Sequence, residues 1–234
     1  MLRSRSLQQY CYRIQAGAST LNKAYVYLVD GIDRLGEDFV ADNILRLPIY
    51  RQEQCNKRWQ DSDRKACVLA YLLLEKGLEE HFGIGHPGSF AYGKYGKPFL
   101  QEEPNVFFSI SHCKKGIACT LANVEVGIDI EEIRPFDINI ARHVCSNEEL
   151  SLLAESANPA RLFCRIWTEK ESYAKALGIG VAEVMTQVLP TDKILHLDSL
   201  ALDNNYCITL AFHPAVSICA SDIVIHRCLT SGIC

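Results

Sequence analysis

The stretch Gly127-Ile128-Asp129-Ile130-Glu131 is followed forty residues later by Trp167-Thr168-Glu169-Lys170-Glu171-Ser172-Tyr173-Ala174-Lys175. Because side chains at positions i and i+2 of a strand point to the same face, a strand here places Asp129 beside Glu131. Residues four apart share a helix face, so a helix over the second stretch brings Glu171 and Lys175 together. Three carboxylates and an ammonium group that converge would suit a hard divalent cation and a phosphate-bearing substrate.

Taken one at a time, both pairs also fit an ordinary protein surface. Ile128 and Ile130 alternate with the acids, as in an edge strand with one apolar and one solvated face. A glutamate four residues before a lysine is among the commonest exposed helix pairs. A solvated acidic face contributes little stability, so Asp129→Ala should stop turnover in a catalytic site without unfolding the chain. The spacing alone leaves the surface and the chemical interpretations open.

Hydrophobic periodicity predicts the surrounding elements. Apolar or alternating runs predict strands at 24–29, 106–111, 117–122, 124–130, 193–197, 206–212 and 216–225. Three- and four-residue spacing predicts helices at 33–47, 61–82, 141–154 and 160–177. The strands largely follow one another, which favours an α+β fold with mainly antiparallel sheets over a doubly wound parallel sheet. Each half of the chain then holds a long helix and several strands, with a seam near 104–116.

Composition places the chain among ordinary globular proteins. Its 234 residues are 48% hydrophobic and 22% charged, and the net charge is −4. This charge gives no reason to expect a nucleic-acid partner. No apolar run approaches the ~20 residues that span a bilayer, so no membrane segment is expected. The first 29 residues contain no Asp or Glu, and residues 1–22 are interpreted as an N-terminal extension.

The eleven cysteines are scattered and odd in number, and no Cys-x-x-Cys pair occurs. Zinc and redox motifs are therefore poor interpretations. Several cysteines sit within apolar segments, where a free thiol behaves as a small hydrophobe: Cys67, Cys119, Cys164, Cys207 and Cys219. We expect free thiols, a reducing compartment and a cytoplasmic protein, without a disulfide framework.

Ser111-His112 ends a β-rich segment. A serine nucleophile with its histidine base is disfavoured, because adjacent strand residues face opposite ways. The chain also lacks the Gly-x-Ser-x-Gly turn that exposes such a serine in one large hydrolase class. A histidine satisfied by local hydrogen bonds remains the plain structural alternative.

Two further segments have both a structural and a chemical interpretation. The residues 93–98, Gly-Lys-Tyr-Gly-Lys-Pro, are typical of a turn. A basic cluster lies before and within the start of the long helix expected at 61–82: Arg51, Lys57, Arg58, Arg64 and Lys65. Such a cluster is either a solvated polar face or a grip on a phosphate group.

Four blocks together resemble the signature of the Sfp-type 4′-phosphopantetheinyl transferases. They are Tyr95 to Pro98, Phe108 to His112, Gly127 to Glu131 and Phe163 to Gly180, in the family's order and with similar gaps. They anchor roughly residues 90–180. The resemblance implies two similar α+β halves related by a pseudo-twofold, at 23–110 and 111–234. The active site would lie between the halves, with the metal site in the second.

The resemblance also implies roles for the acidic and basic residues. It assigns a divalent cation, Mg²⁺, to Asp129, Glu131 and Glu171. It makes Glu131 or Glu171 the general base. Lys175 and His112 would contact phosphate oxygens and complete the catalytic set.

The coenzyme A pocket follows from the same resemblance. It would be lined by Tyr95, Gly96, Lys97, Pro98, Ser111, His112 and Lys175. Arg64 and Lys65 are expected at the 3′-phosphate from their position alone, because this segment does not align residue by residue. The family usually has Asn-x-Ser-His-Ser, whereas this chain has Ser109 and Cys113 at the two ends. Local hydrogen bonding could change at the first position, and a thiol comes near the site at the second.

The function implied is Mg²⁺-dependent transfer of the 4′-phosphopantetheine group from coenzyme A to a serine of an acyl or peptidyl carrier protein. The carrier would bind transiently, 3′,5′-ADP would leave, and the enzyme would be a monomer. Two alternatives stay open: a Mg²⁺-dependent phosphohydrolase acting on a nucleotide or coenzyme A, and a catalytically silent binding module. The carrier, the choice of Mg²⁺ or Mn²⁺ and the acceptance of acylated coenzyme A are not determined by the sequence.

Overall fold

The computed structural model describes residues 10–12, 22–198 and 205–229, and the expected N-terminal extension otherwise lies outside these ranges. Its strands are β1 Tyr10–Tyr12, β2 Ala24–Asp30, β3 Phe90–Tyr92, β4 Pro98–Leu100, β5 Phe107–His112, β6 Gly116–Ala122, β7 Val126–Glu132, β8 Ile194–His196, β9 Tyr206–Phe212 and β10 Ile223–Leu229. Its α-helices are α1 Phe39–Ile44, α2 Ile49–Asn56, α3 Asp61–Phe82, α4 Ile138–Val144, α5 Asn147–Glu155 and α6 Pro159–Leu177. The expected α+β fold is confirmed.

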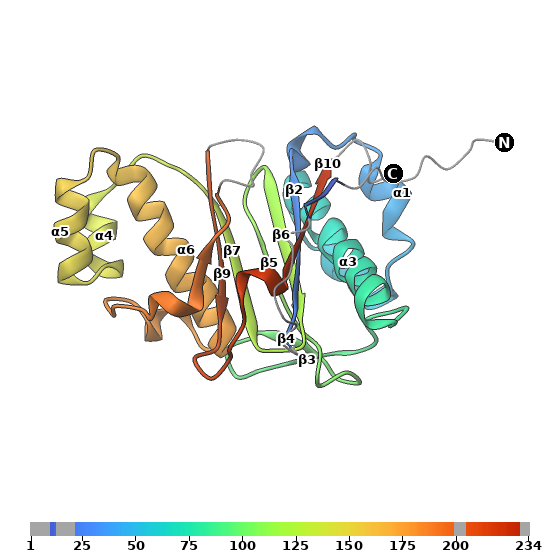
Figure 1. Ribbon diagram of the computed structural model, residues 1–234. Coiled ribbons are helices and arrows are strands. Elements are labelled where there is room, and N and C mark those ends of the chain that lie inside the picture. Colours follow the sequence, from blue (N-terminus) through green and yellow to red (C-terminus); the bar gives the residue numbers. More distant parts are fainter. Residues whose placement is uncertain (1–9, 13–21, 199–204, 230–234) are drawn as a thin grey trace.

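Four layers stack across the molecule (Figure 1). The helix α3 covers one face of a five-stranded sheet, and the other face of that sheet packs on a three-stranded sheet. The helix α6 covers the outer face of the three-stranded sheet and contacts β7 and β9. The two long helices thus lie on opposite sides of a paired-sheet core.

Side-chain alternation along β2 explains why this strand is buried on both faces. Ala24, Val26 and Leu28 belong to the core between the sheets. Tyr27 and Val29 belong to the core under α3. Period-2 alternation sends successive side chains to opposite faces, so one strand supplies both cores.

The pairing of strands is mainly antiparallel, as the sequence predicts. The larger sheet has the order β1-β10-β2-β6-β5, in which only β10 and β2 are parallel. The smaller sheet has the order β7-β9-β8, and β3 pairs with β4 as a separate hairpin. The expected boundary at residues 110 and 111 falls inside β5, and β10 joins the sheet of β2. The division into two halves and their pseudo-twofold relation stay predictions.

The two long helices agree well with the expected ranges because their ends carry clear local signals. Gly83 ends α3 with φ of 69°, and Gly178 ends α6 with φ of 67°. This left-handed conformation favours glycine, which has no Cβ. At its start, α6 has Asn158 as a side-chain cap and Pro159 in the first turn.

Three expected elements are wrong in detail. The helix expected at 33–47 is a 3-10 turn, Ile32–Arg34, followed by the short α1, with Gly36 between them. The helix expected at 141–154 divides into α4 and α5, because Ser146 and Glu149 form a capping box that begins a new helix. The strand expected at 216–225 starts only at Ile223, after the 3-10 turn Ala220–Asp222.

The cysteines also differ from the expectation of free thiols. Cys55 at the end of α2 and Cys67 in α3 form a disulfide, with Cα atoms 5.5 Å apart. Cys119, Cys164 and Cys207 are buried and free as predicted, whereas Cys219 is free but exposed. The sequence could not reveal the disulfide, because its partners meet only when α2 packs on α3. No helix in the described part of the chain is long and apolar enough to cross a membrane.

Candidate functional site

Gly127 determines how closely the strand β7 and the helix α6 approach. An alanine Cβ at this position would collide with the carbonyl oxygen of Ser172 and lie 2.5 Å from the nitrogen of Ala176. Only glycine therefore lets the helix backbone rest on the strand at this point. The helix residues Glu171 and Lys175 are thereby carried to the acidic end of β7.

Lys175 makes the central contact between these two elements. Its Nζ lies 2.7 Å from Oδ1 of Asp129 and donates to the carbonyl oxygen of Ile128 at 3.3 Å. The hydroxyl of Ser111 on β5 also donates to Oδ1 of Asp129, at 2.6 Å. Lys175 therefore pairs with Asp129 on the strand. The surface interpretation, in which Lys175 pairs with Glu171 along the helix, is not what the structure shows. We call Asp129, Glu131, Glu171 and Lys175 the acidic site.

Asp129 is not on a solvated strand face, which corrects the surface interpretation of this strand. The residue is only 3% exposed, and its carboxylate has the ammonium and hydroxyl partners named above. Removing a buried charge leaves its partner uncompensated, which destabilises a protein strongly. The expectation that Asp129→Ala would leave folding untouched is therefore wrong, and an isosteric amide is the better probe.

The other two carboxylates lie within electrostatic reach of Asp129. Burial raises the pKa of Glu131 to about 7, and the charge of Asp129 adds to this effect while Arg134 and Lys175 oppose it. Burial also raises the pKa of Glu171, which the charge of Lys175 lowers in part. Burial and the neighbouring carboxylates thus disfavour the ionised forms of Glu131 and Glu171, and a nearby cation would favour them.

Whether a divalent cation fits these residues depends on the arrangement of their side chains and on the partners of their oxygen atoms. Among the described residues, no group of three or more histidine, cysteine, aspartate or glutamate side chains is arranged to hold a metal ion. The second oxygen of Asp129, Oδ2, is nevertheless buried and has no hydrogen-bond partner in the described part of the chain. Mg²⁺ prefers carboxylate oxygens, binds one or two of them, and completes its shell with water and substrate phosphates. The donor set therefore fits such an ion.

A second feature lies on the other side of β5. A cavity of about 450 Å³ opens there, within the size range of small-molecule sites. It is lined by Arg51, Gln54, Lys57, Arg58, Asp63, Ala66, Cys67, Ala70, Pro98, Ile110 and His112. We call this cavity the basic pocket, because three cations face one carboxylate. Such a surface attracts a multiply charged anion.

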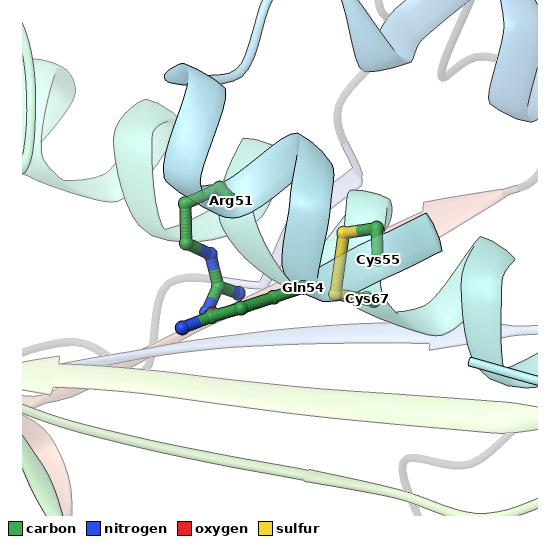
Figure 2. Close-up of a disulfide and its surroundings, with 4 residues drawn as sticks. All are labelled: Arg51, Gln54, Cys55 and Cys67. Atoms are coloured by element: carbon green, nitrogen blue, oxygen red, sulfur yellow. A yellow bond between two sulfur atoms is a disulfide. The ribbon is translucent and has the colours of Figure 1, made fainter. Parts of the chain in front are cut away.

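The helix α2 and the two residues after it carry the cations of the basic pocket: Arg51 lies in the first turn of α2, and Lys57 and Arg58 lie just beyond its C-terminal end. Arg51, Gln54 and Arg58 follow one another at spacings of three and four residues, so they share a face. Nη1 of Arg51 donates to Oε1 of Gln54 at 2.6 Å, and Figure 2 shows the ends of these two side chains meeting. Nε of Arg51 is buried and has no partner among the described residues. Burial lowers the pKa of Arg51.

Arg64 and Lys65 do not line the basic pocket. Arg64 pairs with Asp61 on the surface of α3. Lys65 is buried, pairs with Asp61 at 2.7 Å and donates to the carbonyl oxygen of Leu35. The structure therefore supports Arg51, Lys57 and Arg58 from the same basic cluster as anion contacts. Gln54 and Asp63 were missed, although the helical spacing of Gln54 from Arg51 was a usable signal.

The turn from Tyr95 to Pro98 contributes to the basic pocket through Pro98. Gly96 adopts φ of 82°, which only glycine tolerates easily. Nζ of Lys97 donates to the carbonyl oxygen of Val126 at 3.1 Å, and burial lowers its pKa to about 8. Lys97 thus ties the turn to the start of β7, and Tyr95 is half exposed beside Gly180.

The last two residues of β5 connect the acidic site with the basic pocket. Ser111 bonds to Asp129, whereas His112 lines the pocket, because neighbouring strand residues face opposite ways. Burial lowers the pKa of His112; the charge of Asp63 opposes this shift, and the charges of Arg58 and Lys175 add to it. A ligand that fills the pocket would therefore pass His112 on its way to the acidic site.

Comparisons with known proteins show which proteins this chain is similar to. The family described as the 4′-phosphopantetheinyl transferase superfamily matches residues 125–216, which include β7 and α6. A 4′-phosphopantetheinyl transferase of Bacillus subtilis is 30% identical over 136 residues, 56% of this chain and 60% of the relative.

Two further relatives show the same likeness. The transferase gsp of Aneurinibacillus migulanus is 32% identical over 161 residues, 67% of this chain and 65% of the relative. The transferase Sfp of Bacillus subtilis strain 168 is 29% identical over 154 residues, 63% of this chain and 66% of the relative. The chain thus spans 60% to 66% of the length of these relatives. The region matched by the family model contains the whole of β7 and α6, and the chain is similar there to the 4′-phosphopantetheinyl transferases.

Proposed function

We propose that this protein transfers the 4′-phosphopantetheine group of coenzyme A to a serine hydroxyl of an acyl or peptidyl carrier protein, releasing 3′,5′-ADP. The observation that carries the proposal is the junction at β5. There the basic pocket reaches His112, and the acidic site begins at its neighbour Ser111, which bonds to Asp129. The substrate has the matching division, with a phosphorylated nucleotide at one end and a pyrophosphate next to it.

The basic pocket would hold the nucleotide end. Arg51, Lys57 and Arg58 offer several N–H donors in one cavity, a suitable set for a 3′-phosphate. Pro98 and Ile110 supply apolar surface beside them, which suits the face of an adenine ring. With the nucleotide end in the basic pocket, the pyrophosphate would lie towards His112, whose ring can donate to a phosphate oxygen.

The acidic site would carry out the transfer. Lys175 and His112 stabilise charge on the phosphate oxygens as the bond to 3′,5′-ADP breaks. Glu131 or Glu171 takes the proton of the attacking hydroxyl, directly or through a water molecule. A bound divalent cation, proposed as Mg²⁺ at Asp129, Glu131 and Glu171, supplies charge neutralisation for the pyrophosphate. Ser111 orients Asp129 by its hydrogen bond, so it is a positioning residue.

The nucleophile belongs to the carrier protein, so this chain needs none of its own. We infer a transient carrier complex and a monomeric enzyme, both from the family resemblance. Seven described cysteines are free, which is typical of a reducing compartment and supports a cytoplasmic location. A net charge of −4 gives no support to a nucleic-acid partner.

The test is intact-mass spectrometry of an apo carrier protein incubated with this protein, coenzyme A and Mg²⁺. We expect one phosphopantetheine group to be added to the carrier, and the addition to stop when a chelator is present. Consumption of coenzyme A without modification of any carrier would instead point to hydrolysis. No binding of coenzyme A and no consumption would contradict the proposed function.

A further inference from the structure

The helix α2 supplies the basic pocket but has few other attachments to the protein. It spans eight residues, Ile49–Asn56, and Pro48 at its start provides no side-chain cap. Isolated helices shorter than about 12 residues are marginal in water, so α2 depends on tertiary contacts. Ile49 is 74% exposed, and Cys55 is the buried residue of the helix.

The Cys55–Cys67 disulfide is the firm attachment. Within the described residues, only Tyr50 of α2 makes a side-chain hydrogen bond to a residue beyond the segment 47–58, at 3.3 Å to the carbonyl oxygen of Gly88. Arg51 adds weaker contacts over two aromatic rings. In Figure 2 the disulfide joins the end of α2 to α3, while Arg51 and Gln54 extend from the same short helix. The covalent bond therefore holds the short helix that carries Arg51 and leads directly into Lys57 and Arg58.

The two sulfur atoms differ in how solvent can reach them. Cys55 is fully buried, whereas Cys67 is partly exposed and lines the basic pocket. A thiolate can therefore approach the disulfide at Cys67 from the pocket side. Lys57 and Arg58 line the same cavity, and nearby cations favour thiolates in such exchange reactions.

We propose that the Cys55–Cys67 disulfide is a redox switch that controls binding of the anionic substrate in the basic pocket. When the bond is closed, α2 is fixed and its cations are preorganised for phosphate. When it is reduced, α2 is held by weak contacts alone and affinity falls. This inference rests on the proposed function for the identity of the pocket's ligand. A disulfide in a cytoplasmic protein is commonly of this transient, redox-sensing kind.

The reductant is a dithiol, and the exchange balances. One thiolate of the dithiol attacks Sγ of Cys67, the bond to Cys55 breaks, and Cys55 leaves as a thiolate that takes up a proton. The second thiol of the dithiol then displaces Cys67 and closes a new disulfide. Overall, the dithiol loses two electrons and two protons, and the two cysteines gain them.

Linkage makes the effect reciprocal. If reduction weakens ligand binding by a given factor, the bound ligand must disfavour reduction by the same factor. A ligand in the pocket would in addition cover Cys67 and slow the attack on it. The probe chosen is 3′,5′-ADP, because it carries the 3′-phosphate and has no thiol that could itself reduce the disulfide.

The experiment measures the Kd of 3′,5′-ADP by titration calorimetry for the full chain, oxidised and after treatment with dithiothreitol. We expect the reduced protein to bind about tenfold more weakly, within the usual range of coupling between two sites. The double variant Cys55→Ser, Cys67→Ser should bind like the reduced protein and should not respond to dithiothreitol. The variant Cys219→Ser, which removes a free exposed thiol elsewhere, should respond like the unmodified chain.

A second measurement uses the unmodified chain, so its result does not depend on whether the double variant folds. The rate at which dithiothreitol reduces Cys55–Cys67 in the unmodified chain, followed by mass spectrometry of alkylated peptides, should fall several-fold in saturating 3′,5′-ADP. Equal Kd values for the two forms, or the absence of a Cys55–Cys67 peptide in the oxidised protein, would overturn the switch. If neither form binds 3′,5′-ADP and no carrier is modified, the proposed function fails instead.

Discussion

The acidic site and the basic pocket meet at β5 but are built in different ways. The acidic site sits on β7 and the 19-residue helix α6, which touch along their backbones at Gly127. One wall of the basic pocket is α2, a helix of eight residues joined to α3 by a disulfide. With the proposed roles, chemistry in the acidic site and binding in the basic pocket, the difference has a physical reason: catalytic groups must be fixed more accurately than a cluster of cations.

The first test removes the centre of the acidic site and should have the largest effect. Asp129→Asn keeps the shape but removes the charge that Lys175 and Ser111 contact. We expect transfer to a carrier protein to slow by roughly a thousandfold, or about 4 kcal/mol, in an assay of carrier mass against time. Binding of 3′,5′-ADP in the basic pocket should change little.

Asp192→Asn is the matched control, because this aspartate is exposed and pairs with its neighbour Lys193. It should leave the transfer rate unchanged. A normal rate for Asp129→Asn would show that the acidic site does not perform the reaction.

The second test separates the strand from the helix. In Gly127→Ala the new Cβ meets the backbone of α6, so the helix must move off β7. We expect a loss of about 3 kcal/mol in the free energy of unfolding, measured by urea denaturation. Gly36→Ala is the control, because nothing lies within 4 Å of its new Cβ. Equal stability of the two variants would contradict the close packing of α6 on β7.

The third test addresses the basic pocket. Arg51→Gln removes a cation that lines the cavity, and a charge-assisted hydrogen bond contributes about 1.5–3 kcal/mol. Binding of 3′,5′-ADP, measured by calorimetry, should weaken at least tenfold. Arg64→Gln should have no such effect, because Arg64 pairs with Asp61 outside the pocket. If Arg64→Gln weakened binding more than Arg51→Gln, the 3′-phosphate would instead be assigned to Arg64, as the sequence analysis expected.

The fourth test addresses the stability of the α3 side of the molecule in acid. His81 on α3 stacks on Tyr25 with ring centroids 3.7 Å apart, and burial lowers its pKa to about 4. The titratable and charged groups that face it are Tyr25 and Tyr27 on β2, Lys76 and Glu80 on α3, and His226 on β10. In the unfolded chain His81 takes up a proton near pH 6.5, so the unfolded state binds more protons between about pH 6.5 and 4.

Stability should therefore fall as the pH drops through this window and should recover above it. Since His81 is partly exposed, solvent screening limits its share to about 1 kcal/mol. The measurement is the urea midpoint at several pH values for the unmodified chain and for His81→Gln. An identical pH profile for both proteins would show that His81 has no part in acid sensitivity.

Parts of the fold and site with local signals were predictable from the sequence. The range of α3 matches the expected 61–82 because its leucines recur at helical spacing and Gly83 stops it. β7 alternates Ile128 and Ile130 with acids, and those isoleucines are in the core as expected. The four blocks that resemble the family also lie in one neighbourhood, since β7 contacts both β5 and α6. Lys97 of the remaining block bonds to the carbonyl oxygen of Val126 at the start of β7.

Other features could not be read from the sequence, because they depend on which segments meet. A sequence does not distinguish Arg51 from Arg64, which face different surroundings only after α2 packs on α3. Cys55 and Cys67 are 12 positions apart and belong to no Cys-x-x-Cys pair, so no sequence motif indicates their disulfide. The burial of Asp129 was missed for the same reason, because α6 covers the strand face that alternation alone leaves open to water.

By itself the sequence determined the α+β class, the two long helices and the identity of the acidic residues, because periodicity and end signals act over a few residues. Only the tertiary structure decided that Lys175 pairs with Asp129, that three cations share one cavity, and that β5 divides Ser111 from His112. The pair of Lys175 and Asp129 alone joins positions 46 residues apart. Their formation depends on how the layers pack, and no local pattern encodes that.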